Sequence, residues 1–245
     1  MEIRAAGPAQ APEPVAVTMR TPGHDFELAV GFLFTEGIVG PGGVAAVKYC
    51  ELPDDEEQRF NVVTVELTHP YDGPARQRSF GLTSSCGICG VATLDEVERH
   101  CAPVAAGRVI PASLLSELPD LLRGSQTLFD QTGGLHGAGL FAADGSLCCS
   151  REDVGRHNAV DKIVGHALLS GALPLSGRIL LVSGRVSFEI VQKAALAGVG
   201  VIAAVSAPSS LAVEAADRFG ITVAGFVRNG SYNIYSHPER VDLTS

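Results

Sequence analysis

Hydrophobic positions along the last third of the chain alternate between short continuous runs and helical spacing. Short apolar runs predict buried strands, and the amphipathic stretches between them predict helices. Strands that alternate with helices at this spacing favour right-handed crossovers and a parallel sheet with helices on both faces. This part is therefore predicted to have an α/β fold. The predicted strands are 179–182, 199–205, 221–227 and a short 232–235, and the predicted helices are 187–197 and 209–219.

The earlier part of the chain predicts a mixture of both elements. Two short runs on either side of Asp144-Gly145 predict a β-hairpin. Residues 1–14 resemble an unstructured end, and residues 124–130 resemble a connector. We expect an N-terminal α+β subdomain over residues 1–80 and a second domain over residues 81–245. The predicted strands are 15–20, 60–67, 139–142 and 146–150, and the predicted helices are 25–35, 88–100, 111–122 and 156–169.

Composition and charge narrow the class of protein. The chain has 245 residues, of which 46% are hydrophobic and 18% charged, as in globular proteins with a large core. The net charge of -9 argues against a general role in nucleic-acid binding. No apolar run reaches membrane-spanning length, and the first residues lack the apolar stretch of a signal peptide. We therefore expect a cytoplasmic protein with reduced cysteines that binds neither nucleic acid nor membranes.

Cys86 and Cys89 form a Cys-x-x-Cys motif just ahead of a predicted helix. Such a pair suits redox exchange, metal binding or the transport of a sulfur atom. A structural zinc site needs a second pair of ligands, but Cys148 and Cys149 are adjacent on a predicted strand and should point to opposite faces. The zinc-binding motif of deaminases is also missing. A thiol at a helix start is stabilised as the nucleophilic thiolate, so thiol chemistry fits best and no metal site is expected.

Three loops follow strands of the predicted parallel sheet. Such loops emerge at one edge of a sheet, where ligands bind. Two of the loops begin helices, whose free N–H groups favour anions, and Arg185 and Arg228 add guanidinium groups suited to phosphate. The loops predict an anion or nucleotide pocket, although their Ser and Gly residues also suit ordinary turns and helix caps. The loops are residues 183–187, 206–210 and 228–231.

The polar segment 151–162 allows two interpretations. Its side chains Asp153, Arg156, His157 and Asp161 either line the pocket or form a buried polar network that holds the hairpin against the helix. His136 is likewise either a donor to a ligand or an ordinary loop residue.

A resemblance to a known family runs over nearly the whole chain and is carried by the segments 27–37, 84–90, 133–136, 151–162, 183–185, 206–209 and 225–235. On these segments the chain resembles the FdhD family of formate dehydrogenase accessory proteins. The Arg-Glu-Asp-Val-Gly-Arg-His-Asn run is the most specific part of the resemblance. The resemblance implies a cytidine-deaminase-like three-layer αβα domain without the deaminase zinc. It also implies a sulfurtransferase that passes sulfane sulfur from a cysteine desulfurase to the molybdenum bis(molybdopterin guanine dinucleotide) cofactor of formate dehydrogenase.

The resemblance also assigns roles to residues. Cys86 matches the persulfide-forming cysteine of the family, and Cys89 matches the second cysteine of the motif. We expect a homodimer that works with a cysteine desulfurase and formate dehydrogenase. The alternative is a chaperone that binds the molybdenum cofactor or a guanine nucleotide without a reactive cysteine. The family's cofactor-binding stretch matches Phe226, Val227, Arg228, Asn229, Gly230 and Ser231, and our further candidates for cofactor binding are Ser183, Gly184, Arg185, Ser206, Ser209 and His136.

Overall fold

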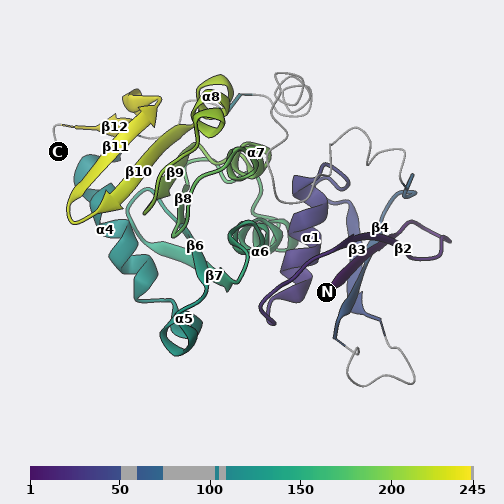
Figure 1. Ribbon diagram of the computed structural model, residues 1–245. Helices are drawn as coiled ribbons and strands as arrows, with labels where there is room; N and C mark the ends of the chain where they lie inside the picture. Colours follow the sequence, from purple (N-terminus) through teal and green to yellow (C-terminus); the bar gives the residue numbers. More distant parts are fainter. Residues whose placement is uncertain (51–59, 74–102, 105–108, 244–245) are drawn as a thin grey trace.

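The computed structural model describes residues 1–50, 60–73, 103–104 and 109–243. Within these ranges the chain forms a smaller and a larger sheet, with helices between them (Figure 1). The predicted helix 88–100 and the predicted domain boundary at residue 80 lie outside the described residues. None of the described helices is long and apolar enough to cross a membrane.

The smaller sheet is built from the N-terminal part of the chain and has the strand order β2-β1-β4-β3. The prediction that residues 1–14 are unstructured is wrong, because β1 lies inside this sheet between β2 and β4. Ile3 and Ala5 of β1 are fully buried. The short strand carries few apolar side chains, so only its pairing with the distant β4 reveals it. The strands are β1 (Glu2–Ala6), β2 (Glu13–Val17), β3 (Val44–Tyr49) and β4 (Val62–Leu67).

The larger sheet has the order β11-β10-β9-β8-β6-β7. Its centre, β8 to β10, is parallel as predicted, but β6 pairs antiparallel with both β8 and β7, and β11 pairs antiparallel with β10, so the sheet is mixed. The hairpin predicted around Asp144-Gly145 is confirmed as β6 and β7. The strands are β6 (His136–Phe141), β7 (Leu147–Asp153), β8 (Ile179–Val182), β9 (Val201–Ala204), β10 (Thr222–Arg228) and β11 (Ser231–Ser236), with a small separate pair β5 (Ile110–Pro111) and β12 (Val241–Asp242) after the 3-10 helix η1 (Pro238–Arg240).

Helices cover both faces of the larger sheet (Figure 1). Leu180 and Val182 of β8 belong to the core beneath α6, α7 and α8, whereas Ile179 and Leu181 belong to the core beneath α4. A strand covered on both faces is apolar at every position, which explains its continuous hydrophobic run. The mixed α/β class is confirmed, and the cytidine-deaminase-like arrangement stays a prediction. The helices are α4 (Ala112–Arg123), α6 (Arg156–Leu169), α7 (Phe188–Ala197), α8 (Ser210–Phe219) and the short α5 (Thr127–Thr132), which replaces part of the predicted connector.

Helix α1 (Asp25–Thr35) joins the two sheets, because it packs against the smaller sheet and along α6 (Figure 1). The helices approach so closely that only glycine fits at the contact. A Cβ on Gly31 would lie 1.8 Å from the carbonyl oxygen of Asp161, and one on Gly165 would lie 1.8 Å from that of Glu27. The contact therefore depends on both glycines.

Three groups of charged side chains surround this helix contact. Lys193 Nζ lies 2.8 Å from both Asp161 Oδ1 and Thr35 Oγ1. Lys162 and Asp153 form an ion pair of 2.7 Å with almost no exposure. A guanidinium nitrogen of Arg151 donates to Glu27 over 2.6 Å, which links β7 to α1.

Substitution Gly31→Ala should destabilise the protein by on the order of 3 kcal/mol, because the added methyl group meets backbone atoms that cannot move independently. Chemical denaturation measures the free energy of unfolding. Gly40→Ala is the matched control, because nothing lies within 4 Å of a Cβ at that glycine. Equal stability of the two variants would contradict the close contact between α1 and α6.

Candidate functional site

Two of the three predicted loops, 183–187 and 206–210, meet at the edge where β8 and β9 end. Val186 N donates to Ala207 O over 3.2 Å, and Ser209 N donates to Val186 O over 2.9 Å. Phe226 N donates to Ser206 O over 3.2 Å, which brings the start of the third segment to the second loop. The expected convergence is therefore confirmed for the loops 183–187 and 206–210, and for the loop 228–231 it stays a prediction.

Several candidate side chains at this edge have structural roles. Ser183 Oγ accepts a hydrogen bond of 2.9 Å from Gly137 N, which ties β6 to the end of β8. Ser209 Oγ caps α8 by accepting from Ala212 N over 3.2 Å. The side chain of Val227 is fully buried in the core beneath α4, so only its backbone can face a ligand. Ser206 is half-buried.

The segment between Phe226 and Ser231 has an unusual backbone. Asn229 and Gly230 both have positive φ, 52° and 74°, which suits the tight turn that joins β10 to β11. Phe226 also has a positive φ of 55°, which is uncommon for an aromatic residue, and the pairing of β10 with β11 is irregular between Gly225 and Arg228. Bulges and strained residues of this kind often aim side chains at functional sites.

Two exposed arginines, Arg185 and Arg228, lie in or near the loops of this edge. The guanidinium of Arg228 lies 5.9 Å from the centre of the Phe226 ring. Arg185, from the first loop, is exposed, as are Arg228, Asn229, Gly230 and Ser231. The rim therefore offers accessible positive charge in a chain whose overall charge is negative.

His136 and Arg156 flank Gly184 at the end of β8. Because β6 runs antiparallel to β8, its first residue, His136, lies beside the loop that follows β8. A Cβ on Gly184 would lie 3.2 Å from His136 Nδ1 and 3.6 Å from Arg156 Cδ. Gly184 thus leaves room for both side chains.

Arg156 carries the clearest sign of a missing ligand. Its Nε is buried and has no hydrogen-bond partner among the described residues. A buried donor without an acceptor costs about 1–3 kcal/mol, and more when it is charged. An anion or a carbonyl group bound between Arg156 and the loops would remove that cost.

Two histidines near Arg156 are held in the neutral form. Burial, together with the charges of Arg156 and Lys193, lowers the pKa of His157 to about 4. His157 Nε2 lies 2.9 Å from Ser187 Oγ at the start of α7 and 3.8 Å from a carboxylate oxygen of Glu189. Burial and the charge of Arg156 also lower the pKa of His136.

The structure separates the two interpretations of segment 151–162. Asp153 and Asp161 belong to the buried ion pairs that hold α6 in place. Arg156 and His157, by contrast, lie at the edge with the loops. Ser187 lies in the predicted loop 183–187 but was not singled out, and Glu189 was not among the candidates, because a Ser and a Glu at a helix start are ordinary helix-capping residues in a sequence.

Cys86 and Cys89 lie outside the described residues. Within the part of the chain that the structure describes, no group of three or more His, Cys, Asp or Glu side chains could hold a metal ion.

The fold and this edge together define a class: an α/β protein with a partly basic edge where its parallel strands end, at which Arg156 keeps a buried donor without a partner among the described residues. The chain belongs to the FdhD/NarQ family, whose model matches residues 10–242. It is 49% identical over 247 residues to the Sulfur carrier protein FdhD of Mycolicibacterium paratuberculosis, covering 98% of this chain and 89% of that protein. It is 50% identical over 251 residues to the protein of the same name from Streptomyces coelicolor, covering 99% of this chain and 87% of the relative.

The fold also matches a solved structure. A protein from Desulfotalea psychrophila, described as a formate dehydrogenase accessory protein, superimposes with a TM-score of 0.72 at 26% identity. The match covers 99% of this chain and 89% of that one.

The imidazole of His157 should titrate with a midpoint near pH 4, as followed by NMR. Because the unfolded chain takes up this proton near pH 6.5 and the folded chain does not, the free energy of unfolding should fall as the pH drops from 6.5 to about 4. His157→Gln should remove part of that fall. Arg156→Gln should raise the NMR midpoint, since the Arg156 charge is the second cause of the lowered pKa. A midpoint near 6.5 in the unchanged protein would contradict the partly buried position of His157 beside Arg156.

Proposed function

We propose that this protein is a sulfur carrier that accepts sulfane sulfur from a cysteine desulfurase on Cys86 and passes it to the molybdenum bis(molybdopterin guanine dinucleotide) cofactor of formate dehydrogenase. Relatives named as sulfur carrier proteins share about half of their residues with this chain over nearly its whole length. The solved structure with the same fold is described as a formate dehydrogenase accessory protein. The Cys86-Gly-Ile-Cys89 motif supplies the thiols that such a role requires.

The acceptance step is an exchange at sulfur. The Cys86 thiolate attacks the outer sulfur of the desulfurase persulfide, so one S–S bond breaks, another forms, and the desulfurase cysteine leaves as a thiolate. Cys89 has two candidate roles: it assists this step, or it attacks the Cys86 persulfide afterwards. In the second role Cys89 attacks the Cys86 sulfur, so a Cys86–Cys89 disulfide forms and the S–S bond of the persulfide breaks. The outer sulfur is thereby reduced and leaves as sulfide.

In this proposal the acceptor binds at the edge where the parallel strands end, next to Arg156. The single observation that carries this assignment is the buried Nε of Arg156, which has no partner among the described residues. A guanine dinucleotide offers phosphate oxygens to Arg156 and, on the outer rim, to Arg185 and Arg228. The neutral His136 and His157 add hydrogen-bonding groups without further charge.

A cofactor chaperone is the second candidate. It would need the same binding site beside Arg156 but no reactive cysteine, so the described residues support it as well as they support the carrier. The behaviour of Cys86 therefore distinguishes the two functions.

Incubation with a cysteine desulfurase and cysteine should add one sulfur atom, about 32 Da, to the peptide that contains Cys86, as measured by mass spectrometry. Cys86→Ala should lose this addition and should fail to restore formate dehydrogenase activity in cells that lack the protein. Cys50→Ala is the matched control, because Cys50 is a free thiol on the N-terminal sheet side of the molecule. Full restoration of activity by Cys86→Ala would favour the chaperone.

Arg156→Gln should weaken the binding of GDP, used as a probe for the guanine dinucleotide, by about 10- to 100-fold. Isothermal titration calorimetry measures the affinity, and a thermal unfolding scan shows whether the variant is folded. Arg123→Gln serves as the control, because Arg123 lies at the end of α4 on the opposite face of the sheet. Unchanged affinity in folded Arg156→Gln would exclude Arg156 from the site.

A further inference from the structure

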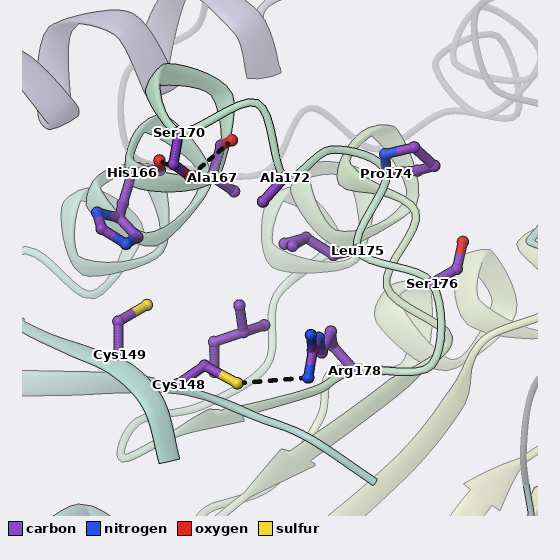
Figure 2. Close-up of a pocket in the computed structure, with 11 residues that line it drawn as sticks. Cys148, Cys149, His166, Ala167, Ser170, Ala172, Pro174, Leu175, Ser176 and Arg178 are labelled. Atoms are coloured by element: carbon purple, nitrogen blue, oxygen red, sulfur yellow. Dashed lines mark hydrogen bonds between the residues drawn. The ribbon is translucent and has the colours of Figure 1, made fainter. Parts of the chain in front are cut away.

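A pocket lies beside the start of β8, at the end of the larger sheet opposite the loops 183–187 and 206–210. Figure 2 shows the side chains that line it. Arg178 lines this pocket and directly precedes β8, whereas the candidate site beside Arg156 lies at the loop that follows β8. The pocket has a volume of about 190 Å³, smaller than a typical site for a drug-sized ligand. Cys148, Cys149 and His166 also line it. It thus combines two thiols with a permanent positive charge.

A bulge in β7 brings both cysteines to this pocket. Cys149 pairs with Leu140 and Leu147 pairs with Phe141, so Cys148 has no partner in the register. The expectation that adjacent cysteines point to opposite faces holds for a regular strand, but an extra residue turns the backbone and re-aims the side chains. The expectation is wrong here, because both residues line one pocket.

The two thiols have different environments. Cys148 is exposed, and its Sγ accepts a hydrogen bond of 3.5 Å from the Arg178 guanidinium (Figure 2). Cys149 is half-buried, and burial raises its pKa to about 11. Exposed cysteines beside positive charge are the ones that react with disulfides and oxidants, whereas buried ones are inert. Cys148 is therefore the reactive member of the pair.

Arg178 is available to a ligand. Among the described residues, the hydrogen bond to Cys148 is the only one that its guanidinium makes. It acts on a nearby carboxylate already: the pKa of Asp144 is lowered mainly by hydrogen bonds from Ser146, and the charge of Arg178 adds to the effect. A guanidinium binds a carboxylate through two parallel hydrogen bonds, and the small pocket suits a ligand of amino-acid size.

We propose that Cys148 is a modification site that forms mixed disulfides with small disulfides bearing a carboxylate, such as cystine, and that Arg178 binds the carboxylate. The Cys148 thiolate attacks one sulfur of the reagent, so the reagent's S–S bond breaks and a new S–S bond to Cys148 forms. Cys148 is oxidised, the departing half of the reagent is reduced to a thiolate, and the proton of Cys148 passes to solvent. The proposal does not depend on the sulfur-carrier role.

Cys149 determines what happens to the product. A neighbouring thiolate would displace the adduct and close a Cys148–Cys149 disulfide, with loss of two hydrogens. The high pKa of Cys149 keeps it protonated near neutral pH, so the adduct on Cys148 persists.

The test compares two small disulfides of opposite charge on the folded full-length chain at neutral pH. The anionic reagent is 3,3′-dithiodipropionate and the cationic one is cystamine. Mass spectrometry of the digested protein follows the rate of adduct formation on the peptide that contains Cys148, and the peptide that contains Cys50 serves as the internal reference. We expect the anionic reagent to react about tenfold faster at Cys148, since the Arg178 charge attracts it and repels the other.

Substitution of Arg178 provides the matched comparison. Arg178→Gln should abolish the preference at Cys148 and leave the rates at Cys50 unchanged, whereas Arg178→Lys should retain part of the preference because it keeps the charge. Any of three results would overturn the proposal: no adduct on Cys148, a preference that persists in Arg178→Gln, or a Cys148–Cys149 disulfide as the main product.

Discussion

The close contact of α1 with α6 is the constraint on which the rest of the structure depends. Gly31 and Gly165 let the two helix backbones approach to a distance that no side chain would allow. The contact unites the core of the smaller sheet with that of the larger sheet, because residues of both belong to one buried cluster. Without it, each sheet would expose an apolar face that a protein of this size must bury.

The buried charges around that contact make its geometry specific. Lys193 bridges Asp161 of α6 and Thr35 of α1, and Lys162 pairs with Asp153 just before α6. Buried pairs add little net stability because desolvation opposes them, but breaking one leaves an uncompensated charge in the core. They therefore penalise any other register of the helices. This fixes the start of α6, and with it Arg156 and His157, at the edge where β8 ends.

The elements that sequence patterns predicted best have strong local signals. Residues 25–35 and 156–169 form helices with the predicted bounds, and 179–182 forms a strand with the predicted bounds, as its continuous apolar run predicts. β1 and β3 escaped prediction because they are short and depend on pairing with β4 across the chain. At the site, the meeting of the loops 183–187 and 206–210 followed from parallel topology, but the bulge in β7 that brings Cys148 and Cys149 to one pocket did not.

The sequence by itself determined the α/β class of the last third, the thiol motif at Cys86 and Cys89, and the loops that follow the parallel strands. Each of these features is set by residues that are close together in the chain. Only the tertiary structure decided which polar residues of segment 151–162 form buried ion pairs and which lie at the edge where β8 ends. Asp161 meets Thr35, 126 positions away, whereas Arg156 keeps a buried donor without a partner among the described residues. Ion pairs and hydrogen bonds between residues so far apart in the chain produce no local sequence pattern, so only the packed structure reveals them.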